Sequence, residues 1–420
     1  MDPVTCAECH PQHYQEWSGS MHAYAAEDPV FRAMNARGQH ETNGELGDFC
    51  VQCHAPLAVQ LGLTEDGLNL DEVPKHLQGV TCYFCHQINE IQGTHNNPLQ
   101  LAFDKVMRGG YGDPVPNKAH GSSYSDLMDR RQLRSSSACG TCHDIVNPKN
   151  VHLERTLVEW SESIFQKGPG ELTCSGCHMP GRTGTVVYNS EGTDYPERRI
   201  HDHSMPGVDI ALTPFPDQAR QRTLVQRELD TSLLLDICVA ETETGSRITV
   251  SFENVGAGHF FPSGATQDRR VWLELEAWQG ANQVFNTGHV ADDRALVDLD
   301  DPNLIWFGDT MTDCNGEETH MFWEACDTQS NTLPVATSFS PLDPDWIDTH
   351  VTRQLQIDIA GITRVTARVK MRPMRLDVID ELIEGGWLDP VHRSAFPVYT
   401  LGSTDVEWTP DLPGACIFGS

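Results

Sequence analysis

Cys6-Ala7-Glu8-Cys9-His10 stands at the start of the chain, and the same pattern of two cysteines, two intervening residues and a histidine occurs four more times. The other copies are Cys50-Val51-Gln52-Cys53-His54, Cys82-Tyr83-Phe84-Cys85-His86, Cys139-Gly140-Thr141-Cys142-His143 and Cys174-Ser175-Gly176-Cys177-His178. Cys-x-x-Cys-His is the attachment site of c-type haem, in which both sulfurs bond to the porphyrin and the histidine binds the iron. The pattern therefore predicts five covalent haem c groups, each with its motif histidine as the proximal ligand.

Three other uses of paired cysteines fit this pattern less well. Zinc sites combine two Cys-x-x-Cys pairs around one metal, but five is an odd number of pairs, and zinc gives no reason for a histidine after each pair. Thioredoxin-like redox chemistry places its motif in a βαβ unit, which the sequence does not show. A plain disulfide scaffold leaves the histidines unexplained. We therefore interpret all five motifs as haem sites.

The charge of the chain limits its partners. Its 420 residues include 29 basic and 60 acidic side chains, a formal net charge of −31. Such a charge repels nucleic acid and anionic lipid, and it suits either solubility or steering toward a cationic redox partner or mineral surface. No run approaches the roughly 18 apolar residues of a membrane-spanning helix. Because c-type haem is attached outside the cytoplasm, we expect a removed export signal and a location in the periplasm or at the cell surface.

All ten haem cysteines and 14 of the 19 histidines lie before about residue 217, so we predict one pentahaem domain over residues 1–217. Five haems over this length leave roughly 42 residues for each, near the size below which a peptide core needs help. The porphyrins must then supply most of the hydrophobic core. We expect mostly irregular backbone with short helices, for example over residues 126–134 and 153–165.

The pattern changes in the second half of the chain. Thr213-Pro214-Phe215-Pro216 interrupts any helix, and a polar, helix-compatible linker follows over residues 217–229. Beyond it, apolar residues alternate with polar ones in five segments. These residues are Leu233, Leu235, Ile237 and Val239; Ile248, Val250 and Phe252; Val271, Leu273 and Leu275; Leu355, Ile357 and Ile359; and Val365, Ala367 and Val369. With one helix at Leu376–Glu384, residues 218–420 are predicted to form an antiparallel β-sandwich of immunoglobulin-like type.

Four cysteines lie outside the haem motifs, in a half expected to face an oxidising compartment where free thiols are uncommon. Cys314 and Cys326 are close in sequence and flank the turn signal Asn315-Gly316, so we predict a disulfide between them. Cys238 and Cys416 would form a second disulfide, joining the first strand to the C-terminal tail.

A second axial ligand on each iron separates an electron carrier from a catalyst. A distal histidine or methionine saturates the iron, whereas an open distal side admits substrate. Nine histidines remain in residues 1–217 after the proximal five, enough for every iron without methionine or a partner chain. His259 lies in a glycine-rich turn of the second half, and we expect it to pack at the interface between the halves.

Several segments resemble the bis-histidine multihaem cytochromes, a family that includes the tetrahaem carrier paired with hydroxylamine oxidoreductase and subunits of extracellular cytochrome filaments. The resemblance is carried by Cys6–His10 with Tyr14, Trp17, Ser20 and His22, by residues 143–180, by residues 199–209, and by residues 254–264, which look like an accessory sandwich. In that family a histidine placed like His22 ligates a different haem from the one that it follows. The tetrahaem members differ in haem number, so the packing order of their haems is not transferable.

The resemblance and the surplus of histidines together predict five distal ligands. They are His22, His95, His120, His201 and His203. His13 follows His10 within one helical turn and is expected to contact a haem propionate, while His76 and His152 are held as reserves.

The expected function is electron transfer through five bis-histidine haems, in an extracytoplasmic carrier or a subunit of an extracellular cytochrome filament. Its partners would be redox proteins or an extracellular electron acceptor, with self-assembly in the filament case. The alternative is an oxidoreductase in which one open-site haem acts on a small nitrogen or sulfur compound. The motifs contain no lysine in place of a proximal histidine, and we assign no catalytic residue.

Overall fold

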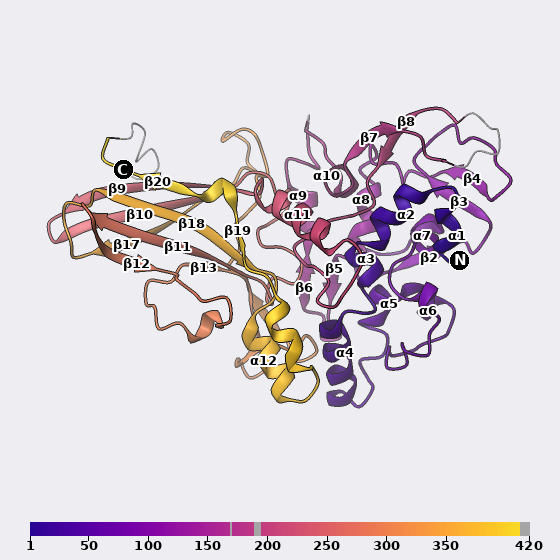
Figure 1. Ribbon diagram of the computed structural model, residues 1–420, viewed down its shortest axis with the longest axis horizontal. Helices are drawn as coiled ribbons and strands as arrows, with labels where there is room; N and C mark the ends of the chain where they lie inside the picture. Colours follow the sequence, from indigo (N-terminus) through magenta and orange to yellow (C-terminus); the bar gives the residue numbers. More distant parts are fainter. Residues whose placement is uncertain (169, 189–194, 412–420) are drawn as a thin grey trace.

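The computed structural model describes residues 1–168, 170–188 and 195–411. It is elongated, with the helical N-terminal half (residues 1–217) at one end and the sheets of the C-terminal half (residues 218–420) at the other (Figure 1). None of the helices in these described ranges has the length and apolar character needed to cross a membrane.

Short helices dominate the N-terminal half. They are α1 (Val4–Ala7), α2 (Pro11–Ser18), α3 (Met21–Tyr24), α4 (Pro29–Glu41), α5 (Val51–His54), α6 (Pro56–Gln60), η1 (Lys75–Leu77), α7 (Cys82–His86), α8 (Ser135–Gly140), α9 (Thr156–Glu162) and α10 (Cys174–His178). Proline begins α2, α4 and α6, where its missing N–H costs no helical hydrogen bond. In three motifs the proximal histidine is the last residue of its helix, so the motif itself supplies one helical turn under the porphyrin.

Four two-stranded ladders connect these helices. They are β1 (Ile88–Ile91) with β2 (Leu99–Leu101), β3 (Val106–Gly109) with β4 (Gly121–Tyr124), β5 (Asp144–Val146) with β6 (His152–Arg155), and β7 (Gly181–Gly184) with β8 (Arg198–His201). All are antiparallel except the pair β3 and β4. A hydrophobic cluster that includes Phe31, Leu57, Leu77 and Phe84 lies in this half, so a peptide core is present, and the share of the core supplied by porphyrins stays a prediction.

The two helices predicted for this half have different outcomes. The segment 153–165 contains α9, whereas residues 126–134 form turns instead of a helix. Side chains explain the turns: Ser125 Oγ accepts from the Leu127 N–H at 3.3 Å, and Asp129 Oδ1 accepts from the Arg131 N–H at 3.1 Å. Such local bonds offer the backbone an alternative to the helical ladder.

Helix α11 (Gln218–Leu229) occupies the predicted linker and leads into two antiparallel sheets. One sheet has the strand order β17 (His350–Ile357), β10 (Gly245–Asn254), β9 (Leu233–Thr242). The other has the order β12 (Asn282–Thr287), β11 (Arg270–Gln279), β18 (Arg364–Arg372), β19 (Tyr399–Thr400), with β13 (Trp306–Phe307) paired to β11 and β20 (Val406–Trp408) paired to β18.

The five predicted strand segments correspond to β9, β10, β11, β17 and β18, and their apolar residues share one hydrophobic core. Phe252 of β10 is fully buried in this core and meets Phe307 edge to face, with ring centroids 5.0 Å apart. Helix α12 (Leu376–Glu384) begins and ends as predicted, and η2 (Leu296–Asp298), η3 (Pro390–Ala395) and η4 (Gly402–Thr404) lie in connections. The antiparallel sheets are confirmed, while the immunoglobulin-like topology stays a prediction.

Contacts join the two halves at α4 and α12, which lie side by side in Figure 1. One hydrophobic cluster draws residues from both halves: Val30, Ala33, Met34, Leu46, Met321, Trp323, Ile379, Leu382 and Leu388. Arg37 forms an ion pair with Glu381 at 2.7 Å, and Trp323 Nε1–H donates to Glu41 Oε2 at 3.0 Å. The sequence pattern changes near residue 217, but the side chains of the two halves pack against each other across this boundary.

A small sheet of β14 (Thr310–Thr312), β15 (Glu318–Thr319) and β16 (Asp327–Gln329) carries the predicted Cys314–Cys326 disulfide, with Cα atoms 5.0 Å apart. Cys238 is also disulfide-bonded. Cys416 lies outside the described residues, so its pairing with Cys238 stays a prediction.

Replacing Cys314 and Cys326 together with serine should lower the free energy of unfolding by about 3 kcal/mol, because the bond closes a short loop in the unfolded chain. Chemical denaturation of the holoprotein would measure this loss. A double variant as stable as the wild type would show that the small sheet is held by its hydrogen bonds alone.

Candidate haem-ligand site

Four of the five proximal histidines, His10, His54, His86 and His178, are oriented by backbone carbonyls. The Nδ1–H of His10 donates to the Val186 carbonyl at 2.8 Å, and that of His54 donates to the Ala25 carbonyl at 2.9 Å. Equivalent bonds join His86 to Arg108 O at 2.6 Å and His178 to Pro206 O at 2.8 Å. Each bond fixes the ring and leaves Nε2 as the nitrogen available to a metal.

Three proximal rings face a second imidazole at similar separations. Ring centroids are 6.4 Å apart for His10 and His120, 6.5 Å for His86 and His203, and 6.2 Å for His143 and His22, and the His13 ring also lies 6.2 Å from that of His10. An iron with a nitrogen of each ring about 2 Å away would hold the centroids roughly 6 Å apart. The residues present therefore fit a bis-histidine haem at three of the five motifs.

The distal partners have free nitrogens of the kind that such a site needs. His120 Nδ1–H donates to the Gly121 carbonyl at 2.8 Å and His203 Nδ1–H to the His201 carbonyl at 2.9 Å, so Nε2 remains available in both rings. Nδ1 of His22 is buried and has no hydrogen-bond partner among the described residues. A buried nitrogen without a hydrogen bond lowers the stability of the fold. Such a nitrogen is therefore typical of a ring that binds a ligand.

Burial also sets the protonation of these rings. It lowers the pKa of His22 to about 4, and it lowers the pKa values of His143 and His203 to about 3. All three are neutral at pH 7, which is the form of imidazole that binds a metal ion.

For the other two predicted distal residues, His95 and His201, the described part of the chain offers no proximal histidine at this separation. The His95 ring lies 6.2 Å from the ring of the reserve His152, and the electrostatic neighbours of His201 include Arg130 and Arg199. Their assignment stays a prediction. His13 lies 4.7 Å from the His203 ring and within 4.8 Å of a Glu16 oxygen, next to the predicted haem ligands.

The haem cysteines cluster across motifs that are distant in sequence. The side chains of Cys6 and Cys82 are neighbours. The second and fourth motifs meet at Cys53 and Cys142, and the fourth and fifth meet at Cys139 and Cys174. Cys85 of the third motif interacts electrostatically with Cys142. The fourth motif thus has the second, third and fifth as neighbours.

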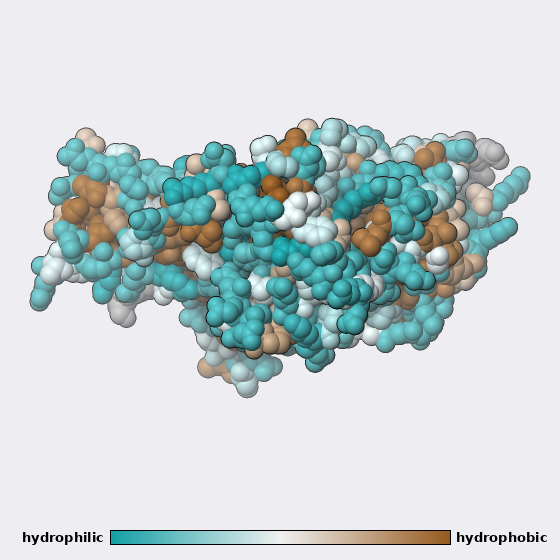
Figure 2. Space-filling model, turned by 90° about the horizontal axis from the view of Figure 1, so that it is seen from below, coloured by the Kyte–Doolittle hydropathy of each residue, from teal (hydrophilic) through white to brown (hydrophobic). Residues whose placement is uncertain are grey.

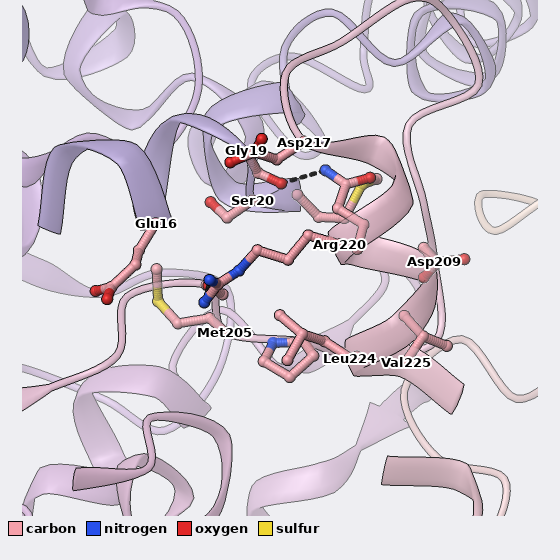
Figure 3. A pocket seen from close by; sticks show the side chains of 14 residues that line it. Glu16, Gly19, Ser20, Met205, Asp209, Asp217, Arg220, Leu224 and Val225 are labelled. Atoms are coloured by element: carbon pink, nitrogen blue, oxygen red, sulfur yellow. Dashed lines mark hydrogen bonds between the residues drawn. The ribbon is translucent and has the colours of Figure 1, made fainter. Parts of the chain in front are cut away.

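A small pocket lies where α11 meets α2 and α3 (Figure 3). Arg220 extends into it from α11 and binds Asp202 at 2.8 Å, while Met205 and Pro206 form another part of its wall. Because the Pro206 carbonyl accepts from His178, the pocket wall is part of the structure that positions this proximal ring.

The glycine-rich turn at residues 255–264, which we call the 255–264 loop, is bound to α9 of the N-terminal half. Glu159 Oε2 accepts from Ser263 Oγ at 2.6 Å and from the Phe260 N–H at 3.2 Å. Thr156 Oγ1 lies 2.8 Å from Ser263 Oγ and accepts from the Gly264 N–H at 3.1 Å. These bonds hold the loop beside the haem motifs.

Glu159 should make stability depend on pH. Burial raises its pKa from 4.5 to about 7, so between these values the folded protein binds more protons than the unfolded chain. The stability that this group supplies is complete below pH 4.5 and is lost as the pH rises through 7, by up to about 3 kcal/mol. Denaturation curves at several pH values should show a smaller fall for Glu159→Gln than for the wild type, and identical slopes would contradict this.

Comparison with known proteins gives one match at the start of the chain and one over nearly its whole length. The family model described as cytochrome c554 and c-prime matches residues 5–87. No curated protein matches the chain. Among solved structures, the chain is similar to a penta-haem cytochrome c552 from Thermochromatium tepidum, with 21% sequence identity, coverage of 97% of this chain and 98% of that chain, and a TM-score of 0.64.

The likeness to the solved structure shows the fold, and the family match confirms the predicted multihaem c-type cytochrome, while the number of haems stays a prediction. The family match covers the first three motifs, through His86. Residues 5–87 are therefore similar to the cytochrome c554 and c-prime family, and the chain contains a multihaem c-type cytochrome domain.

Proposed function

We propose that this protein transfers electrons through five covalently bound c-type haems, most of them held between two histidines. The observation that carries the proposal is the set of three proximal–distal ring pairs at 6.2–6.5 Å. An iron with both axial positions filled exchanges electrons but does not bind substrate. The chain's part is to fix the spacing, burial and hydrogen bonding of each haem.

The contacts among the haem cysteines support a branched path. The pair Cys6 and Cys82 connects the first haem to the third, and Cys85 with Cys142 connects the third to the fourth. The second and fifth haems then join at the fourth motif. Electron transfer slows steeply as the gap between porphyrin edges grows, so adjacent attachment points favour rapid exchange.

The location and partners follow from general chemistry. Proteins with c-type haem are generally extracytoplasmic, and we propose the periplasm or the cell surface for this chain. The face shown in Figure 2 is mostly hydrophilic, with apolar residues in small groups, which agrees with the net charge of −31. An acidic surface of this kind suits a cationic redox partner, whose association should slow as salt is added.

The C-terminal half supports two versions of this role. Its sheets have the orders β17–β10–β9 and β12–β11–β18, with β20 on β18, which is compatible with the immunoglobulin-like sandwich that we infer. As a docking module it would serve a periplasmic shuttle, and as a joint it would connect filament subunits. Electron microscopy of the purified holoprotein decides between them, since persistent monomers would exclude the filament.

The test of the main proposal is spectroscopic. Mass spectrometry should find five haems, and magnetic spectroscopy of the oxidised protein should show mostly low-spin iron. Polypeptide without haem, or mainly five-coordinate high-spin iron, would contradict the proposal.

A second candidate function, an oxidoreductase acting on a small nitrogen or sulfur compound, is favoured by one observation. Among the described residues no imidazole pairs with His54, whose ring stacks on Phe31 with centroids 4.0 Å apart and planes 2° apart. The ring pairs leave His178 without a partner as well, but His54 is the one with an aromatic ring stacked on it, so the haem at Cys50 and Cys53 is our candidate for an open distal side. Carbon monoxide should bind the reduced protein at that haem if it is open, whereas an absent spectral change would leave only the carrier.

A further inference from the structure

We infer that His259, from the C-terminal half, is the distal ligand of the haem attached at Cys174 and Cys177. This inference rests on the proposed function, because it requires a haem at the fifth motif. If His259 is this ligand, the C-terminal half contributes a residue to a haem site of the cytochrome domain.

The first step concerns which irons still need a ligand. The three ring pairs supply partners for His10, His86 and His143, and they leave His54 and His178. His259 and His22 are both electrostatic neighbours of His178, and His22 already pairs with His143, which leaves His259 for His178. His201 is the predicted distal residue nearest in sequence to His178. Its principal charged neighbours are arginines and an aspartate, and not His178.

The second step concerns the chemistry of the ring. The Nδ1–H of His259 donates to the Phe260 carbonyl at 2.8 Å, the same arrangement that fixes the proximal rings. No hydrogen-bond partner of its Nε2 is found in the described part of the chain, so this nitrogen is free to bind a metal. A carbonyl bond at one nitrogen and a free second nitrogen is the usual arrangement of a metal-binding histidine.

The third step concerns how the loop is held. Asn254 Nδ2–H donates to the His259 carbonyl at 2.7 Å, while Asn254 Oδ1 accepts from the Ala257 N–H at 3.3 Å. Together with the bonds from Thr156 and Glu159, these contacts fix the 255–264 loop from both of its sides. A ring that merely filled a gap between the halves would not need its backbone held by four side-chain contacts, whereas an axial ligand must be placed accurately.

The test compares holoprotein variants by iron spin state. In His259→Ala, one haem should change from low-spin to high-spin, and the reduced protein should bind one more equivalent of carbon monoxide than the wild type. Added imidazole should restore the low-spin spectrum. The matched control is His289→Ala, which removes a half-exposed histidine of the same half, and it should leave the spectra unchanged.

Several outcomes would overturn the inference. Unchanged spin state and carbon monoxide stoichiometry in His259→Ala would exclude ligation, and so would a loss of low-spin iron in His201→Ala alone. If the alanine variant fails to fold, His259→Met keeps the test open, because a methionine-ligated haem would show a raised reduction potential at one site only. A wild-type protein with fewer than five haems would instead contradict the proposed function.

Discussion

Replacing Cys139 and Cys142 together with alanine should abolish the fold of the N-terminal half and stop electron transfer between the first and fifth haems. The fourth motif meets the second, third and fifth through Cys142 and Cys139, so its loss removes the connection among them. Truncating one large core side chain costs about 3–5 kcal/mol, and the void left by a whole porphyrin is far larger. That cost is comparable to the entire stability of a typical domain.

The matched control is the double replacement of Cys6 and Cys9, at the end of the chain of contacts. It should cost one haem but leave the other four reducible, because Cys6 of the first motif meets Cys82 of the third, at one end of the series of contacts between motifs. Haem content, circular dichroism and reductive titration measure both variants. Equal losses in the two variants would contradict the branched arrangement.

Phe252→Ala should destabilise the C-terminal half by about 4 kcal/mol, the second-largest effect that we expect. The side chain is fully buried between the two sheets, where it contacts Phe307, and alanine would leave a cavity that the surrounding strands cannot fill. Chemical denaturation of the holoprotein, followed by tryptophan fluorescence, measures the change.

Leu234→Ala is the control for that measurement. Leu234 lies in β9 opposite Glu253 of β10, but 49% of its surface is exposed, so its truncation should change stability by less than about 0.5 kcal/mol. Similar losses in both variants would show that the core is not centred where the two sheets meet.

The sequence predicted the elements whose signal is local. Alternation of apolar residues located five strands, and the two glycines after Glu384 marked the end of α12. The five motifs identified the cofactor because covalent attachment requires adjacent cysteines and histidine. The Cys314–Cys326 bond followed from a turn between two cysteines that are close in sequence.

What the sequence did not predict depends on contacts between distant residues. The pairing of His22 with His143, and of His120 with His10, joins segments about 110–120 residues apart, so no spacing rule could assign them. Short strands such as β13 and β20 were missed because two or three residues show no periodicity. His259 was placed at the interface between the halves, but its free Nε2 and its proximity to His178 appear only in the folded chain.

The shared packing of α4 with α12 has a consequence for biogenesis. Haem is bonded to the cysteines by an external enzyme system, which must reach each motif while the surrounding polypeptide is still open. Since Trp323 and Ile379 lie buried against Val30 and Met34, docking of the C-terminal half would obstruct that access. Maturation should therefore proceed in a fixed order, with covalent loading first and closure by the later-synthesised sheets afterwards.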